Sequence, residues 1–147
     1  MKEKFSNLLK LLSLVQIRII DSHERVLSDE TPLKQEEDIS IETIQSINDK
    51  FPLFDGTFIK FNLKYDFNFS RKKNGKSVVY FSAAYVVVVT FKASDVDQAK
   101  ELLSNEDLMN IFITQQLKKT LWPMFRTVLM DAMSRHSLQV VLLPWIK

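Results

Sequence analysis

Hydrophobic and polar residues alternate strictly between Ile59 and Phe69. One parity holds only aliphatic and aromatic residues, whereas the other holds lysine, asparagine and aspartate. Since successive side chains of a strand point to opposite faces, a period of two places the two sets on opposite faces. The pattern predicts a strand with a dry face made of Ile59, Phe61, Leu63, Tyr65, Phe67 and Phe69.

A second strand is predicted from Val78 to Phe91, after a turn at Asn74-Gly75. Asn-Gly is a strong hairpin signal, because a type I′ turn needs positive φ at both central positions. The two strands should therefore pair antiparallel. One face of the second strand is expected to hold Val79, Phe81, Ala83, Tyr85, Val87, Val89 and Phe91. The opposite face is small and hardly polar, so we expect it to be covered within the chain or to meet another chain.

Weaker patterns precede this hairpin. Leu12–Ile20 mixes apolar residues on both parities with Gln16 and Arg18, which predicts a first, half-covered strand. Asp29–Lys50 is polar and acidic without a steady apolar period, and we interpret it as a long connection with room for a helical turn. In the segment Phe51–Gly56, Pro52 and Asp55-Gly56 disfavour a helix, so the aromatic residues of this segment should lie in a loop or a short edge strand.

Helical patterns follow the hairpin. Ser94 is the expected N-cap of the first helix, and Asn105 should end that helix or cap the next one. At about 100° per residue, the apolar residues between Leu121 and Met133 cover an arc of roughly 180°, so this helix is expected to bury two sides. Trp122-Pro123 marks either the start of the helix or a bend, because proline removes a backbone donor. Residues 138–147 should be extended or turn back over the domain.

Composition indicates one domain, residues 1–147. The chain is 46% hydrophobic with two Gly and four Pro, which suits a packed core with few loops. It has no cysteine, which excludes disulfides and fits a reducing compartment. Residues 1–20 are basic and then apolar, but Arg18 interrupts the run and no small-residue cleavage site follows. Ser77–Phe91 is too short to span a membrane as a helix. We expect a soluble, cytoplasmic protein without membrane insertion.

The sequence offers little for catalysis. His23 and His136 lie far apart without neighbouring ligands of the kind a metal site needs, and two glycines cannot build a phosphate loop. The acidic run at residues 36–38 is typical of a solvated surface, and the basic residues around 71–76 are typical of a soluble turn. A formal net charge of +2 does not indicate a nucleic-acid partner. We therefore expect no cofactor, no metal and no enzyme activity.

The end of the chain resembles the SecB family of export chaperones. That family carries an aromatic-Pro step in its late helix, then an aromatic-Arg pair, a Ser-Arg step and a Leu-rich stretch that ends in proline. The corresponding residues here are Leu121, Trp122, Pro123, Phe125, Arg126, Ser134, Arg135, Leu143 and Pro144. The order and length of the strands agree with the family as well.

The resemblance implies an α+β subunit with a four-stranded antiparallel sheet and long C-terminal helices on one face. It also implies a homotetramer, assembled as a dimer of dimers with the helices between the sheets. Trp122, Phe125, Leu129 and Met133 would then serve helix packing and oligomer contacts. The implied activity is that of an ATP-independent holdase, which keeps unfolded or nonnative polypeptides in a hydrophobic groove. Its client-contact residues would be Phe51, Pro52 and Phe54, with Leu142 and Trp145 beside them.

One departure from the family affects the choice of partner, and another affects the turn after the late helix. Dedicated export chaperones are strongly acidic and present carboxylates to the SecA motor, whereas this chain is near neutral with Lys60 and Lys64 on its wet face. The chain also has His136 and Ser137 where a glycine is usual. A SecA partnership is therefore not expected, and the client is either a preprotein or a labile antitoxin. Two alternatives remain: an immunity-type oligomer with one native partner, and an enzyme with an unrecognised site.

Overall fold

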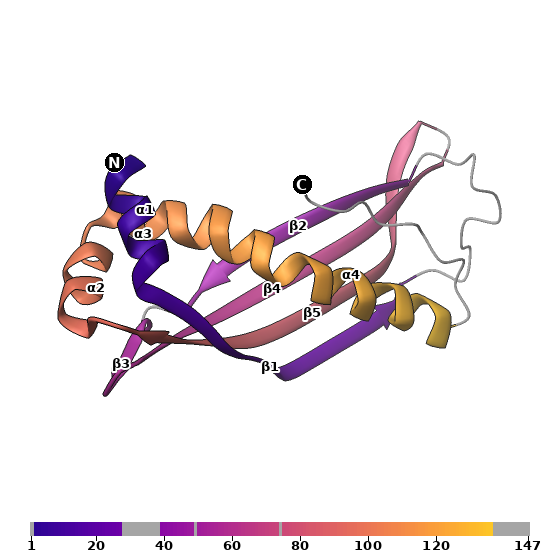
Figure 1. Ribbon diagram of the computed structural model, residues 1–147. Coiled ribbons are helices and arrows are strands. Elements are labelled where there is room, and N and C mark those ends of the chain that lie inside the picture. Colours follow the sequence, from indigo (N-terminus) through magenta and orange to yellow (C-terminus); the bar gives the residue numbers. More distant parts are fainter. Residues whose placement is uncertain (1, 28–38, 49, 74, 137–147) are drawn as a thin grey trace.

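The computed structural model describes residues 2–27, 39–48, 50–73 and 75–136, except the side chains of Ile39 and Lys73. One helix precedes five successive strands, and the remaining helices follow these strands (Figure 1). The elements are α1 (Lys2–Leu11), β1 (Leu12–Val26), β2 (Ile39–Ile47), β3 (Leu53–Asp55), β4 (Phe58–Lys73), β5 (Lys76–Ala93), α2 (Val96–Leu103), α3 (Glu106–Ile111), the π-helical segment η1 (Phe112–Leu117) and α4 (Lys118–Arg135). None of these helices is long and apolar enough to cross a membrane.

The strands form one antiparallel sheet in the order β1-β5-β4-β2. The three-residue β3 pairs with β4 beyond the end of β2, so it continues the same edge of the sheet. The prediction of an α+β fold with an antiparallel sheet and a long C-terminal helix is confirmed, and the short β3 makes the strand count five instead of four. The helices lie on one face, with α4 running diagonally across the strands (Figure 1). We call the opposite face the outer face.

The central hairpin follows the predicted pattern over most of its length. Gly75 has φ +77°, and β4 pairs antiparallel with β5 from Phe58 to Lys73. The register shifts between Phe69 and Ser70, which makes Tyr80 an extra residue in β5. Tyr80 is consequently buried, and Val79 turns to the outer face with 37% exposure. The predicted place of Val79 on the dry face is wrong, because strict alternation cannot reveal a bulge.

The second strand contradicts the predicted long connection at residues 29–50. Residues Ile39–Ile47 form β2, paired in regular register with β4. Its core-facing parity includes Thr43 and Gln45, so the sequence shows no apolar period of two. Gln45 is tolerated there because its side-chain amide donates to the Tyr65 hydroxyl at 2.6 Å and to the Ile113 carbonyl at 3.1 Å. A hydrogen-bonded polar residue at a core-facing position thus breaks the apolar alternation by which a strand is predicted.

The N-terminal part also differs from the prediction. Residues 2–11 form α1, which the sequence did not indicate, and Leu8 on it is fully buried. The first strand continues beyond the predicted Leu12–Ile20 to Val26. Register shifts next to Val15 and Ile20 mark two bulges, and these explain why apolar residues occur on both parities.

Asp95, not Ser94, caps α2. The Asp95 carboxylate accepts a hydrogen bond from the Gln98 amide at 3.1 Å, whereas the Ser94 amide donates to the Leu11 carbonyl at 2.9 Å. The predicted cap was therefore wrong by one residue. Asn105 caps α3 by accepting from the Leu108 amide at 3.1 Å, which confirms the second of its two predicted roles.

Pro123 lies inside α4, in its second turn and exposed. Of the two predicted roles, a helix start is excluded, because α4 begins at Lys118 directly after η1. The helix is irregular upstream of the proline, where η1 has π-helical hydrogen bonding. The Ile113 carbonyl of η1 accepts a hydrogen bond from the Gln45 side chain. Among the described residues, the fully buried side chains of α4 are those that face the sheet, and Met124 and Val128 are half-buried. Burial of a second side stays a prediction for an assembly.

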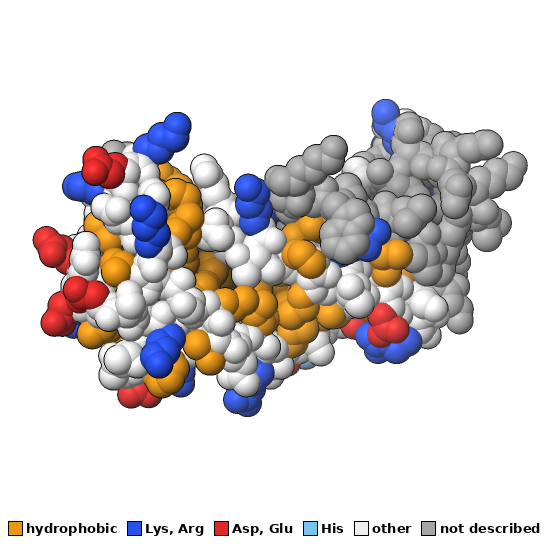
Figure 2. Space-filling view, in the orientation of Figure 1, with side chains coloured by type: hydrophobic (Ala, Val, Ile, Leu, Met, Phe, Trp, Pro, Cys, Tyr) orange, Lys and Arg blue, Asp and Glu red, His pale blue; other side chains and the backbone are white. Residues whose placement is uncertain are grey.

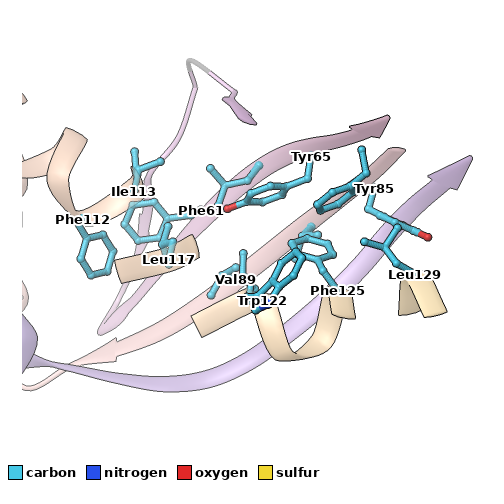
Figure 3. Close-up of a cluster of buried hydrophobic side chains, with 14 of the residues drawn as sticks. Phe61, Tyr65, Tyr85, Val89, Phe112, Ile113, Leu117, Trp122, Phe125 and Leu129 are labelled. Atoms are coloured by element: carbon cyan, nitrogen blue, oxygen red, sulfur yellow. The ribbon is translucent and has the colours of Figure 1, made fainter. Parts of the chain in front are cut away.

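Aromatic rings fill the space between the sheet and α4 (Figure 3). The Phe125 ring centroid lies 4.7 Å from that of Tyr65, 5.2 Å from Phe67 and 5.9 Å from Tyr85. Phe61 meets Phe112 at 5.3 Å nearer to η1. The dry face predicted for β4 is confirmed, since all six of its members are at most 1% exposed. This core fixes the sheet edges and the helix on which the candidate site depends.

Candidate functional site

The aromatic segment singled out in the sequence lies at the β2–β3 edge of the sheet. The Phe51 amide donates to the Asn48 carbonyl at 2.9 Å, and this turn directs the chain from β2 into β3. Phe51 and Pro52 are half-buried. Phe54 packs against the core, and the Lys100 ammonium of α2 lies 5.3 Å from its ring centroid. The structure thus brings Phe51, Pro52 and Phe54 together on one edge.

The most exposed apolar side chains of this edge are different residues. Leu53 is 46% exposed and Phe58 is 39% exposed. Both side chains point to the outer face. Paired residues of neighbouring strands share a face, and Leu53 pairs with Lys60 whereas Phe58 pairs with Lys92. The exposure of Phe58 could have been predicted from the sequence. In the alternation that begins at Ile59, Phe58 falls on the solvent-facing side together with Lys60. We call Phe51, Pro52, Leu53, Phe54 and Phe58 the aromatic edge.

Leu142 and Trp145, the other two client-contact predictions, lie outside the described residues. The four α4 residues predicted for helix packing and oligomer contacts lie against the chain's own sheet. Trp122 is 8% exposed, Phe125 2%, and Leu129 and Met133 are fully buried. Because these side chains are already covered within one subunit, an oligomer contact of α4 would have to use its other side.

A second exposed apolar surface follows the opposite edge of the sheet. Half of the large exposed hydrophobic residues in the described part of the chain are on β1 or directly after it: Leu14, Val15, Ile20, Val26 and Leu27. Hydrophobic side chains also gather in the band where α4 lies beside β1 (Figure 2). We call these five residues the β1 apolar edge. Uncovered apolar surface was expected from the sequence, but not at this edge.

The far end of α4 is tied to β1 by a charged cluster. Glu24, whose side chain is 13% exposed, accepts from the Arg135 guanidinium at 2.9 Å and from the Tyr85 hydroxyl at 3.3 Å. His136 lies 3.1 Å from the other Glu24 oxygen. Arg135 also pairs with Asp131 at 3.0 Å on the same helix. The cluster holds the helix end on the sheet, which is a structural role.

Two buried tyrosines, Tyr65 and Tyr85, do not suit acid–base catalysis. Burial raises the pKa of Tyr65 to about 12, and the hydrogen bond from Gln45 offsets part of this rise. Burial, and then the neighbouring Glu24 carboxylate, raise the pKa of Tyr85. Both phenols thus move away from neutral pH, where a general acid or base is effective. Among the described residues, no group of three or more His, Asp or Glu side chains could hold a metal ion.

Two hollows of about 350 Å³ lie away from the aromatic edge. Phe5, Gln116 and Lys119 contribute to one, between α1 and η1, and Ile44, Asp66 and Ala84 contribute to the other, on the outer face. Both are shallow and have mixed polar and apolar walls. Neither gathers a set of groups that indicates a particular ligand.

Comparison with solved structures identifies the fold. The Mycobacterium tuberculosis Rv1957 SecB-like chaperone, solved in complex with a ChAD peptide from the Rv1956 HigA1 antitoxin, matches this chain with a TM-score of 0.72. The match covers 99% of this chain and 97% of that chain at 13% sequence identity. No model of a known protein family and no curated protein matches the sequence. The tail motif predicted this resemblance, and the chain has the α+β fold of a SecB-like chaperone.

Proposed function

We propose that this protein is an ATP-independent holdase, which binds unfolded or nonnative polypeptides at the aromatic edge and the apolar surface around it. The observation that carries the proposal is the SecB-like fold over 99% of the chain, since the structural relative was solved with a peptide bound. Fold alone does not define function, so the surface has to support the idea as well. Leu53 and Phe58 supply that support, because they expose large apolar side chains next to Phe54.

The chemistry of this edge suits weak binding of many sequences. Its side chains are aliphatic and aromatic, and hydrophobic contact is non-directional. Lys100 of α2 lies over the Phe54 ring, and Lys60 and Lys92 are the pairing partners of Leu53 and Phe58. A client held at several such edges of one assembly would gain affinity by multivalency without a specific motif. No step requires a nucleotide, a cofactor or a metal.

The proposal includes a homo-oligomer, with a tetramer built as a dimer of dimers. The β1 apolar edge supports self-association, because monomeric proteins seldom leave such a row of side chains in water. The half-buried side of α4 offers a second contact. We place this assembly in the cytoplasm, without membrane insertion or nucleic-acid binding, since the cysteine-free chain fits a reducing compartment.

A labile antitoxin is the client we favour over exported preproteins handed to SecA. The outer face carries cations on both strands that flank β5, including Arg18, Arg25 and Lys64. Its described carboxylates are fewer, and Asp66 lies 3.9 Å from the Lys64 ammonium. A cationic face does not fit a partner that docks on carboxylates. The antitoxin peptide in the complex of the structural relative supports the same choice.

Client holding can be tested by introducing charge at the aromatic edge. Leu53→Asp combined with Phe58→Asp should weaken binding of reduced, carboxymethylated α-lactalbumin by at least about tenfold, because a carboxylate cannot enter an apolar contact without losing hydration. Val79→Asp is the matched control, since Val79 is similarly exposed on the outer face but lies near the β4–β5 turn. Equal binding by the wild type, the double variant and the control would remove the aromatic edge from the site. Circular dichroism and mass should be unchanged in both variants.

A further inference from the structure

Two lysines lie beside the exposed apolar residues of the aromatic edge. Lys60 of β4 pairs with Leu53, and Lys92 of β5 pairs with Phe58. Paired residues of an antiparallel sheet have their Cβ atoms about 4.5–5.5 Å apart and point to the same face. Each exposed apolar side chain of this edge is therefore an immediate neighbour of a side chain that carries an ammonium group.

A third lysine lies on the opposite face of the aromatic edge. Phe54 pairs with the fully buried Ile59, so the Phe54 side chain points towards the helices. The Lys100 ammonium of α2 lies 5.3 Å from the Phe54 ring centroid, and the lysine side chain is exposed. A polypeptide that crosses the aromatic edge would thus meet a positive charge on either face of the sheet.

These three lysines are not engaged in ion pairs within the described part of the chain. Lys64, further along β4, differs from them because its ammonium lies 3.9 Å from the Asp66 carboxylate. The two lysines of the outer face are also diagonal neighbours, since Lys60 pairs with Thr90, two residues before Lys92. Like charges in such positions repel each other, so an anion bound between them would be stabilised.

The nearby carboxylates leave these lysines available. Asp55 on β3 is a diagonal neighbour of Lys60, and two strand spacings, about 10 Å, separate it from Lys92. On α2, Asp97 precedes Lys100 by three residues and forms no ion pair with it. An acidic side chain of a bound polypeptide can therefore pair with each ammonium group without displacing a described carboxylate of this protein.

We propose that the aromatic edge preferentially binds client segments in which aspartate or glutamate residues flank large apolar residues. This inference rests on the proposed holdase function and names the chemical class of its clients. The apolar side chains of the client contact Leu53 and Phe58, and its carboxylates pair with Lys60, Lys92 and Lys100. An exposed ion pair changes affinity by only about 1.4–5-fold, so hydrophobic contact supplies most of the binding and the lysines bias the choice of segment.

The same lysines disfavour clients with the opposite charge pattern. A secretory signal sequence has a positively charged region directly before its apolar run. Binding of that apolar run at the aromatic edge would bring like charges close to the lysines, which costs affinity. The charge of the edge therefore favours an acidic client over an exported preprotein held near its signal sequence.

Competition between matched peptides tests this preference on the wild-type protein. Three unstructured peptides share the same leucine and phenylalanine residues, and the positions beside these residues carry glutamate, glutamine or lysine. Fluorescence anisotropy in about 0.1 M salt should show the glutamate peptide binding about tenfold more tightly than the lysine peptide, at about twofold per lysine of the edge. In about 1 M salt, where the Debye length is about 3 Å, all three should bind within about twofold of one another.

Charge variants of the lysines assign the preference to this edge. Lys60→Gln combined with Lys92→Gln keeps two long polar side chains and should reduce the preference to about twofold. Lys72→Gln combined with Lys76→Gln is the matched control, because it removes the same charge from exposed residues at the far end of the β4–β5 hairpin. The control should keep the full preference. Lys60→Glu combined with Lys92→Glu should bind the lysine peptide more tightly than the glutamate peptide, with unchanged circular dichroism and mass.

The possible failures distinguish this inference from the proposed function. If the glutamate and lysine peptides bind the wild type equally, the charge preference is absent and the holdase function stands without it. If the control variant loses the preference as fully as the variant at Lys60 and Lys92, the charge of the whole protein causes it and the inference is wrong. If neither the peptides nor reduced, carboxymethylated α-lactalbumin bind, the proposed function fails together with the inference.

Discussion

Phe125 is the residue whose removal should affect stability most clearly. Its side chain is 2% exposed, and its ring contacts the rings of Tyr65, Phe67 and Tyr85 at centroid distances of 4.7–5.9 Å. Loss of a fully buried phenylalanine side chain from the core forfeits about 1.5–3 kcal/mol of transfer free energy. The three aromatic contacts and the cavity left behind add to this, so we expect Phe125→Ala to lower the free energy of unfolding by about 3–5 kcal/mol.

Urea unfolding followed by far-UV circular dichroism measures this change at one fixed protein concentration, because self-association would add to the apparent stability. For a chain of this length the melting temperature should fall by roughly 6–20 °C. Thr127→Ala is the control on the exposed side of α4, where the change should be within about 0.5 kcal/mol. A loss below about 1 kcal/mol for Phe125→Ala, or equal losses for both variants, would show that α4 does not pack on the sheet as described.

Two further predictions concern the Gln45–Tyr65 contact. Gln45→Ala should destabilise the protein by about 1–3 kcal/mol in urea unfolding, because the Ile113 carbonyl and the Tyr65 hydroxyl lose their donor. Gln115→Ala should have little effect, because Gln115 is an exposed residue of η1. An equal loss for both would refute a specific role of Gln45. The pKa of Tyr65 is about 12 in the folded protein against 10.0 as its ordinary value, so the unfolded chain ionises first. The stability contribution is complete below pH 10, and about 2–3 kcal/mol should be lost as the pH rises towards 12. Tyr65→Phe should make this alkaline slope shallower, and an unchanged slope would contradict the buried phenol.

The parts of the fold that were predictable are those where one physical signal dominates. β4 has apolar residues at every second position because one face packs on helices and the other meets water, and Asn74-Gly75 supplies the turn. β2 was missed for the opposite reason: Thr43 and Gln45 occupy core-facing positions, and the partner that satisfies Gln45 is an Ile113 carbonyl far away in sequence. A local pattern carries no information about such a distant hydrogen bond. The bulge at Tyr80 is likewise set by pairing with β4.

Prediction of the candidate site was limited in the same way. The segment Phe51–Phe54 was found because several aromatic residues cluster around a proline, but exposure depends on where α2 lies. Lys100 and the core cover Phe54, which leaves Leu53 and Phe58 as the exposed members. The β1 apolar edge was not predicted, because its two bulges remove the simple alternation that would have assigned a face to each residue.

The mass of the protein in solution, with and without reduced, carboxymethylated α-lactalbumin in slight deficit, tests the central proposal most directly. Multi-angle light scattering should show a homo-oligomer, expected to be a tetramer, that forms a stable soluble complex with the unfolded chain. A monomer that leaves the unfolded chain free would contradict the holdase proposal. Its SecB-like fold would then serve a different partner at the same apolar edges.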